Sequence, residues 1–246
     1  MLGVSACGGS DSGGGTLKDG ELSMCSDIPY EPFEFEGDGP DGLKYTGFDV
    51  ELINAVAKKA ELDLKIKVVP FDGILGNLAA KDCDVAVSSI SITDERADKV
   101  RFSEPYFDAD QSLLVKKDSG AKSLDDLADK TIGAKSGTGE AYAKENTPDG
   151  ATVKSFDGAD GLFTALAAGD IDAVLQDFPV NAYRATKDDS VEVVETFKTD
   201  EQYGFAVRKD NEDLQTTIND AMEELRSDGT YDDLYEKYFG TKPPES

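Results

Sequence analysis

The sequence predicts an α/β fold made of two lobes. Runs that fit strands alternate with runs that fit helices along most of the 246 residues, a pattern typical of mostly parallel sheets with helices on both faces. The alternation completes one round before residue 111 and begins again near residue 113, which indicates two lobes. The run 85–92 is almost entirely apolar or small, as expected of a strand covered on both faces.

In the first round of strands and helices, the spacing of apolar residues predicts which segments are helices and which are strands. Phe48, Leu52 and Val56 recur every four residues, which predicts a helix with one buried face. Apolar and polar residues alternate over 62–68, which predicts a half-buried strand. The expected elements are a strand at 22–26, a helix from Phe48, a strand at 62–68, a helix at 73–81 and a strand at 85–92.

The second round repeats the pattern and ends in helices. We expect strands at 113–116, 131–134, 153–156, 173–176, 191–195 and 203–208. We expect helices at 124–128, 139–146, 161–168, 179–186, 212–226 and 231–238, the last two separated by Asp228 and Gly229.

The composition excludes several classes of function. Apolar residues make up 39% of the chain, enough for a proper core, and 51 acidic against 25 basic residues give a formal charge of −26. Such a chain repels nucleic acids and anionic membranes. Histidine is absent, which excludes a Ser-His-Asp hydrolase and a histidine-based zinc site. We expect no metal and no cofactor.

The first sixteen residues resemble a processing site followed by a tether. Residues 4–7, Val-Ser-Ala-Cys, are similar to a bacterial lipobox, in which Cys7 would be lipidated after signal cleavage. The glycine- and serine-rich run 8–15 reads as a flexible linker. The alternative is a cloning remnant with an incidental cysteine. No run of about 18 apolar residues follows, so we expect membrane contact only through a lipid on Cys7.

Two further cysteines, Cys25 and Cys83, each lie in a short strand-like run. A disulfide between them is permitted if the chain works outside the cytoplasm. The alternative is a pair of buried free thiols that pack as small hydrophobes.

The segment 88–106, SSISITDERADKVRFSEPY, carries the chemistry most suggestive of a ligand. Arg96 follows the apolar strand by a few residues, and a guanidinium offers two parallel N–H donors that match a carboxylate. The neighbouring hydroxyl residues are Ser88, Ser89, Ser91 and Thr93. The alternative for a single arginine in this position is a surface ion pair.

A second segment, KSGTGEAYA at 135–143, lies between a predicted strand and a predicted helix. The backbone N–H groups at Thr138 and Gly139 would therefore point toward an anion at the helix N-terminus. The alternative is an ordinary tight turn.

Eight segments resemble, in order, the extracytoplasmic solute-binding proteins that supply polar amino acids to ABC transporters (extracellular solute-binding family 3). The nearest patterns are the glutamine-binding and the lysine/arginine/ornithine/histidine-binding proteins. Residues 21–240 contain these segments: CSDIPYEPFEFEG, YTGFDVELINAVAKKAEL, VPFDGILGNLAAKDCDVAVSSISITDER, VRFSEPYF, IGAKSGTGEAYAKEN, ALAAGDIDAVLQD, YGFAVRKDN and LRSDGTYDDLYEKYFG.

The resemblance implies a periplasmic-binding-protein-like type II fold, in which two α/β lobes are joined by two hinge strands. The crossings are expected near 110–113 and 202–206. Lobe 1 would then be 17–111 plus 204–246 and lobe 2 would be 112–203, after the lipobox and tether at 1–16.

The resemblance also implies roles in a cleft between the lobes. Arg96 would bind the α-carboxylate of an amino acid, helped by the backbone N–H groups of Thr138 and Gly139. Ser88 would be one of the neighbouring hydroxyl residues that bind the ligand. Asp177 would bind the α-ammonium with Ser91 Oγ and the Ser89 carbonyl, although Asp177 could instead cap the next helix. The residues expected around the ligand side chain are Tyr30 and Phe71 as aromatic walls, Asp27 at the far end, and Lys135 and Gln176 from the other lobe.

The resemblance favours a binding protein without catalysis, with glutamine as ligand, arginine or lysine second and glutamate third. The partners would be the free amino acid and the transporter's membrane permease. The chain would act as a monomer on the outer face of the cytoplasmic membrane or in the periplasm. A dehydratase of cyclic carboxylic acids with Glu140 as general acid, and a sensory ligand-binding module, are the rival hypotheses.

Overall fold

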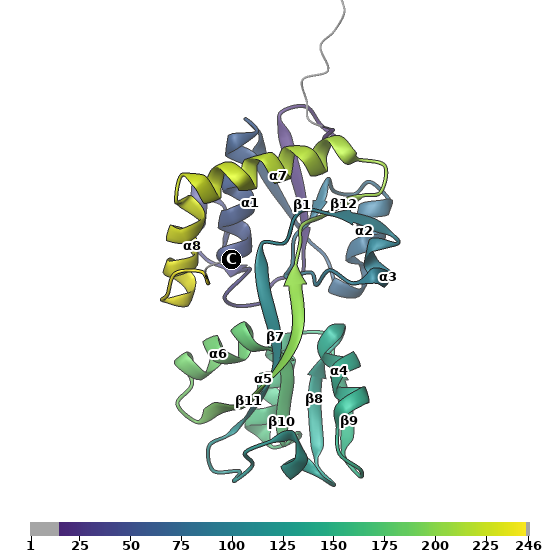
Figure 1. Cartoon of the computed structure of the whole chain (residues 1–246), viewed down its shortest axis with the longest axis vertical. Coiled ribbons are helices and arrows are strands. Elements are labelled where there is room, and N and C mark those ends of the chain that lie inside the picture. The colour runs from purple at the N-terminus through teal and green to yellow at the C-terminus, as the bar shows by residue number, and fades with distance from the viewer. Residues whose placement is uncertain (1–14, 245–246) are drawn as a thin grey trace, which may run out of the picture.

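Two five-stranded sheets, one above the other in Figure 1, organise the protein. The structure is a computed structural model that describes residues 15–244. Cys7 and the predicted lipobox lie outside the described residues.

The first sheet contains, in spatial order, β4 (Asp63–Val68), β1 (Glu21–Ser26), β5 (Val85–Ala86), β12 (Ala206–Arg208) and β6 (Val100–Phe102). The second contains β11 (Val191–Tyr203), β7 (Phe107–Lys116), β10 (Ala173–Asp177), β8 (Thr131–Lys135) and β9 (Thr152–Phe156). A small hairpin pairs β2 (Phe35–Glu36) with β3 (Tyr45–Thr46).

Helices cover both faces of each sheet. Around the first sheet lie α1 (Phe48–Lys59), α2 (Ile74–Ala79), α3 (Asp94–Ala97), α7 (Glu212–Ser227) and α8 (Thr230–Phe239). Around the second lie α4 (Thr138–Asn146), α5 (Ala159–Ala168) and α6 (Phe178–Lys187). Short 3₁₀ turns occur at Pro40–Gly42, Phe71–Gly73 and Leu124–Leu127.

The predicted fold class, two α/β lobes with mostly parallel sheets, is confirmed. In the first sheet only β12 runs against its neighbours, and in the second only β7 does so. Between the sheets, β7 and β11 pair with each other, Phe107 opposite Tyr203 and Ala109 opposite Glu201. Figure 1 shows these two long strands connecting the lobes. We propose the following lobe boundaries. Lobe 1 consists of residues 17–111 and 204–246, and lobe 2 consists of residues 112–203.

The expected strand at 85–92 is much shorter than predicted. β5 ends at Ala86, and Ser89 adopts a positive φ of 48°, which a strand cannot accommodate. The apolar pattern still reports burial, since Val87 and Ile90 are fully buried. The apolar run therefore predicted correctly that these residues are buried in the core, but it predicted the wrong backbone conformation after Ala86.

The core of the first lobe is rich in aromatic side chains. Phe33, Phe48 and Phe107 pack edge to face, with ring centroids 5.0–6.2 Å apart. Helices α1, α7 and α8 supply the apolar residues on this face of the sheet, while α2 covers the other face. Because α7 and α8 follow the second crossing strand, the C-terminal part of the chain completes the core of the first lobe.

A disulfide joins Cys25 on β1 to Cys83, just before β5. The two residues are 58 positions apart, and both are fully buried beneath α2. Of the two alternatives that the sequence left open, the structure has the bridge.

Replacing both cysteines with alanine is expected to lower the free energy of unfolding by about 2–4 kcal/mol, because the crosslink removes conformations from the unfolded chain. Urea denaturation of the oxidised protein and the double variant measures the difference. Wild type treated with a reductant is the matched control and should unfold like the variant. Equal midpoints before and after reduction would show that the bridge contributes nothing.

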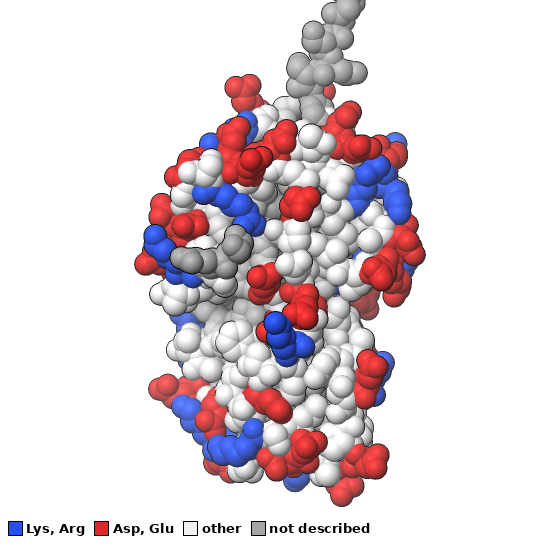
Figure 2. Space-filling view, in the orientation of Figure 1, with Lys and Arg blue, Asp and Glu red and all other residues white. Residues whose placement is uncertain are grey.

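Acidic side chains predominate on the face shown in Figure 2, with lysines and arginines interspersed over both lobes. This distribution agrees with the formal charge of −26. Within residues 15–244 no helix is both long enough and apolar enough to cross a bilayer.

Candidate functional site

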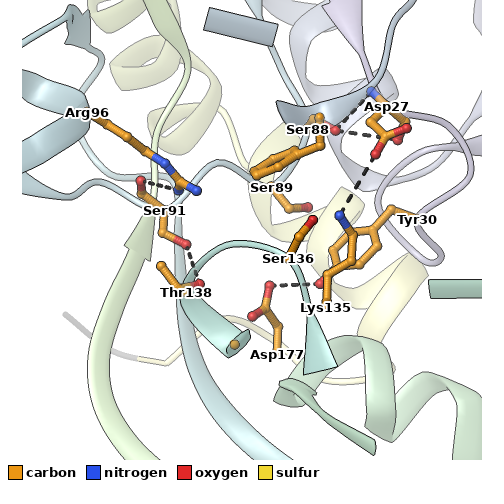
Figure 3. Close-up of a pocket in the computed structure, with 12 residues that line it drawn as sticks. Asp27, Tyr30, Ser88, Ser89, Ser91, Arg96, Lys135, Ser136, Thr138 and Asp177 are labelled. Carbon is orange, nitrogen blue, oxygen red and sulfur yellow. Dashed lines mark hydrogen bonds and ion pairs between the residues drawn. The ribbon is translucent and has the colours of Figure 1, made fainter. Parts of the chain in front are cut away.

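A pocket lies between the lobes, where residues from both sheets meet. It is lined by Asp27, Tyr30, Phe71, Ser88, Ser89, Ser91, Arg96, Lys135, Ser136, Thr138, Gly139 and Asp177. Eleven of these residues were named from the sequence; Ser136 was not. Figure 3 shows Arg96 and the Lys135–Asp27 pair at opposite sides of the view, with Asp177 between them.

The ends of parallel strands place these side chains. Asp27 follows β1 and Phe71 follows β4 closely, so both lie at the carboxyl edge of the first sheet. Lys135 ends β8 and Asp177 ends β10, at the carboxyl edge of the second sheet. Because ligands of such sheets bind at these edges, two edges facing one another make one site.

Arg96 lies in α3 and has no carboxylate partner among the ion pairs of the described residues. Its Nη1 donates to the backbone oxygen of Ser91 at 2.9 Å, and its guanidinium carbon lies 5.3 Å from the centre of the Phe71 ring. Burial lowers the pKa of Arg96 from its usual value, although the group stays charged at neutral pH. The surface ion pair considered as an alternative is therefore absent, and the remaining guanidinium donors are available to an anion.

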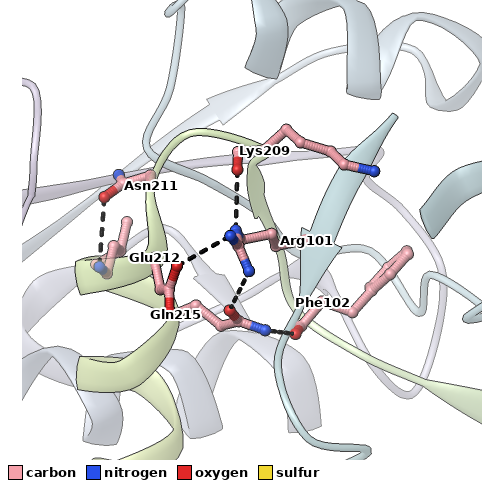
Figure 4. Close-up of polar contacts among 7 residues, drawn as sticks. Arg101, Phe102, Lys209, Asn211, Glu212 and Gln215 are labelled. Atoms are coloured by element: carbon pink, nitrogen blue, oxygen red, sulfur yellow. Dashed lines mark hydrogen bonds and ion pairs between the residues drawn. The ribbon is translucent and has the colours of Figure 1, made fainter. Parts of the chain in front are cut away.

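Helix α3 has only four residues, and contacts at both of its ends hold it in place. Thr93 Oγ1 accepts a hydrogen bond from the Arg96 amide at the N-terminal end. Lys209 Nζ donates to the backbone oxygens of Ala97 and Asp98 at the other end, at 2.9 and 3.0 Å. The Lys209 carbonyl in turn accepts from Arg101 Nε at 2.9 Å, in the network of Figure 4. These contacts fix the helix that carries Arg96.

The N-terminus of α4 faces Arg96 from the other lobe. Gly137 has a φ of 115°, and a Cβ added there would lie 3.4 Å from Arg96 Nη2. At Gly139 an added Cβ would approach Gln111 Oε1 to 3.1 Å, so a side chain would crowd the helix start. The two glycines thus let a nine-residue helix bring its free N–H groups close to the guanidinium.

Asp177 is buried and accepts hydrogen bonds, and no ion pair joins it to a cation within residues 15–244. Its Oδ2 accepts from the hydroxyls of Tyr30, at 2.9 Å, and of Tyr203, while its Oδ1 accepts from Gln111 Nε2 at 2.6 Å. Although Asp177 occupies the N-cap position of α6, its side chain makes no capping hydrogen bond. The helix-cap alternative is therefore wrong, and a buried negative charge faces the pocket.

Opposite charges meet at the far side of the pocket. Lys135 Nζ lies 3.9 Å from Asp27 Oδ2 and has no hydrogen-bond partner among the described residues. It also lies 4.6 Å from the centre of the Phe71 ring. Burial lowers the pKa of Lys135 and raises the pKa of Asp27. A ligand group that both donates and accepts hydrogen bonds fits between them.

Of the four serines in the pocket wall, the three from the first lobe, Ser88, Ser89 and Ser91, differ in what they offer. Ser88 Oγ is occupied, since it donates to Glu34 Oε1 at 2.7 Å and accepts from the Asp27 amide at 3.1 Å. Ser91 Oγ donates to Glu201 Oε2 at 2.7 Å and lies 3.4 Å from Thr138 Oγ1 on the other lobe. Ser89 Oγ is buried and has no partner among the described residues. Ser89 is thus the serine with a free hydroxyl in the wall.

Gln176 is not among the lining residues. It is fully buried, and its Nε2 donates to Asn181 Oδ1 at 3.0 Å. Successive side chains of a strand point to opposite faces, so β10 directs Asp177 into the pocket and Gln176 away from it. The expectation that both residues reach the ligand is corrected accordingly.

Two residues behind the pocket were missed from the sequence. Gln111 on β7 and Glu201 on β11 meet where the crossing strands lie side by side, and Gln111 Nε2 donates to Glu201 Oε1 at 2.9 Å. The same amide group donates to Asp177. Burial raises the pKa of Glu201, and nearby Asp177 adds to the effect. No local pattern marks these residues, because their partners lie far away in the sequence.

The arrangement suits retention of a zwitterion better than catalysis. It has a cation without an ionic partner, a buried carboxylate and a helix N-terminus within one enclosed space. Glu140, the candidate general acid of the rival hypothesis, pairs with Lys144 at 2.5 Å, and that hydrogen bond lowers its pKa. Glu140 is therefore ionised at neutral pH and has no proton to donate.

Comparison with known proteins agrees with this geometry. The family model for bacterial extracellular solute-binding proteins, family 3, matches residues 22–241. The L-cystine-binding protein TcyJ of Escherichia coli strain K12 is 38% identical over 226 residues, covering 90% of this chain and 83% of that protein.

Two solved structures are also similar. An ancestral arginine-binding protein bound to glutamine is 40% identical, with a TM-score of 0.80 over 90% of this chain and 98% of that one. The ancestral amino acid-binding protein AncCDT-1, described as a precursor of cyclohexadienyl dehydratase, is 38% identical, with a TM-score of 0.79 over 89% and 95%. Because the family model covers nearly the whole chain, the protein belongs to the bacterial extracellular solute-binding proteins, family 3.

Proposed function

We propose that this protein captures a polar L-amino acid between its lobes and delivers it to the membrane permease of an ABC importer. The observation that carries the proposal is the presence of Arg96 and Asp177 in one pocket, each without an ionic partner. The guanidinium suits the α-carboxylate, and the N-terminus of α4 adds to the attraction. Asp177 suits the α-ammonium, with the Ser89 carbonyl and Ser91 as further acceptors.

Contacts across the pocket explain how the ligand would favour closure. Tyr30 in lobe 1 donates to Asp177 in lobe 2, and Ser91 lies against Thr138. A ligand that binds Arg96 on one side and Asp177 on the other adds interactions made only when the lobes are together. Such differential contacts shift the population toward the closed form, which the permease would recognise.

The far side of the pocket favours glutamine. The carboxamide oxygen would accept from Lys135, and the amide N–H₂ would donate to Asp27. Arginine and lysine would place a cation near Lys135, and glutamate would place an anion near Asp27. L-cystine, the ligand in the name of the E. coli relative, also ends in both donors and acceptors and belongs in the same test.

We place this activity outside the cytoplasm, with the chain anchored through a lipid on Cys7. The buried disulfide supports an oxidising compartment, since such bridges are rare in the cytosol. Mass spectrometry of the protein recovered from membranes would detect the lipid on Cys7.

A thermal-shift screen of the twenty amino acids and L-cystine tests the proposal. At a concentration one hundred times its Kd, a ligand that binds only the folded state adds about 2.7 kcal/mol, or roughly 5–10 °C for a chain of this size. L-Glutamine is expected to give the largest shift. The absence of a shift with every compound would contradict amino acid binding.

Changing Lys135 to Met should convert the preference from glutamine toward arginine. The substitution removes the positive charge beside Asp27, so the affinity ratio of arginine to glutamine should rise about tenfold or more. Calorimetric titration with both amino acids measures the ratio. Lys154, which is exposed on β9, provides the control Lys154→Met, and its ratio should equal that of wild type. A ratio unchanged in Lys135→Met would remove Lys135 from the specificity assignment.

A further inference from the structure

Two buried carboxyl groups lie directly beneath the serines of the pocket. Glu34 and Asp49 are both fully inaccessible to solvent, and neither contacts the pocket itself. Glu34 Oε1 accepts from Ser88 Oγ at 2.7 Å, and Asp49 Oδ2 accepts from the Ser89 amide at 2.8 Å. Each carboxyl group therefore holds one of two consecutive residues in the wall.

Each of the two carboxyl groups has one remaining oxygen. Glu34 Oε2 and Asp49 Oδ1 are both buried and have no hydrogen-bond partner among the described residues. Two carboxylate oxygens are both acceptors, so the two groups can satisfy one another only if one of them carries a proton. Two adjacent buried charges without that proton would repel strongly.

The part of the chain that the structure describes supplies no cation that could replace the proton. The groups that face the pair are Tyr106, which donates to Asp49 Oδ2 at 2.8 Å, Tyr30 and Asp27 of the same lobe, and Lys135 across the pocket. Lys135 is the one positive charge in this set, and its ion pair is with Asp27. Burial raises the pKa of both carboxyls, that of Asp49 to about 7 and that of Glu34 well above its usual value.

We infer that Glu34 is a positioning residue that donates a proton to Asp49, so that the hydrogen-bonded acid pair fixes Ser88 and Ser89 for the ligand. The inference rests on the proposed function and extends it to residues that touch no ligand. Ser89 needs such support, because its φ of 48° is uncommon for a residue with a side chain. Its amide is held by Asp49, and its carbonyl is the acceptor proposed for the ligand's ammonium.

The variants Glu34→Ala and Glu34→Gln test the inference. Alanine removes the carboxyl acceptor of the Ser88 hydroxyl and the donor inferred for Asp49 Oδ1, so affinity for the amino acid found in the screen should fall about tenfold or more. Glutamine still accepts from Ser88, and its amide donates permanently to Asp49, so it should restore most of the affinity. Glu36→Gln, an exposed change two residues away, is the matched control. Equal losses in Glu34→Ala and Glu34→Gln would overturn the inference.

Thermal unfolding without ligand gives a readout that does not depend on the proposed function. Burial raises the pKa of both carboxyls, so the native pair keeps a proton that the unfolded carboxyls, with pKa values near 4, have already released. The pair's contribution to stability therefore falls as the pH rises from about 4 through about 7, the pKa of Asp49. Glu34→Gln has no such proton, so its Tm should vary less with pH than the Tm of wild type or Glu36→Gln. Identical pH profiles for wild type and Glu34→Gln would also overturn the inference, even if no amino acid binds.

Discussion

Arg96→Ala is expected to weaken amino acid binding more than any other single change proposed here, while leaving the protein folded. Removing the guanidinium leaves the ligand's carboxylate enclosed without its counter-ion, a loss of about 2–5 kcal/mol, or roughly 30- to 5,000-fold in Kd. The fold should survive because, among the described residues, the Arg96 side chain makes a single hydrogen bond, to the Ser91 carbonyl. Calorimetric titration and thermal unfolding of the same preparation separate the two effects.

The matched control for this variant is Arg184→Ala. Arg184 lies on α6, pairs with Asp188 at 2.7 Å and lines no part of the binding pocket. Its removal should leave Kd within about twofold of wild type. An Arg96→Ala protein that binds as tightly as Arg184→Ala would show that the guanidinium does not hold the ligand.

Asp177→Asn should have the second largest effect. Asparagine keeps the shape of the side chain and can still accept hydrogen bonds from Tyr30 and Tyr203, so the closed arrangement remains possible. The charge that would bind the α-ammonium is lost, which should weaken binding by about 2–5 kcal/mol. Titration with the amino acid selected by the screen measures the loss.

Asp189→Asn, an exposed change at the end of α6, is the control for Asp177→Asn. It removes the same charge from the same lobe and should leave Kd unchanged. If the two variants weaken binding equally, the effect of Asp177 is one of net charge on the lobe, and its direct contact with the ammonium is refuted.

The resemblance to family 3 placed eleven of the twelve lining residues in the cleft. The α/β alternation supports that placement only in general terms, because it predicts that ligands bind at the carboxyl ends of the strands, where Lys135 and Asp177 lie. The contacts behind them were not predictable in this way. Glu201 meets Ser91 from 110 positions away, and Asp49 meets Ser89 from 40 positions away.

The sequence also misjudged the direction of one side chain and the length of several strands. Gln176 was expected beside Asp177 in the pocket, yet neighbours on a strand face opposite ways. The crossing strand β11 runs to Tyr203, eight residues past its predicted end at 195. Its polar residues mask the strand because this segment bridges the lobes and has little apolar surface to bury.

Two ligands that differ only in the carboxylate test the contact between Arg96 and that carboxylate most directly. The affinities of wild type and Arg96→Ala are measured for the selected amino acid and for its decarboxylated amine. The account predicts that the substitution costs at least about 2 kcal/mol with the amino acid and almost nothing with the amine, because only the former has a carboxylate for Arg96. An equal loss with both compounds would contradict the pairing of Arg96 with the carboxylate.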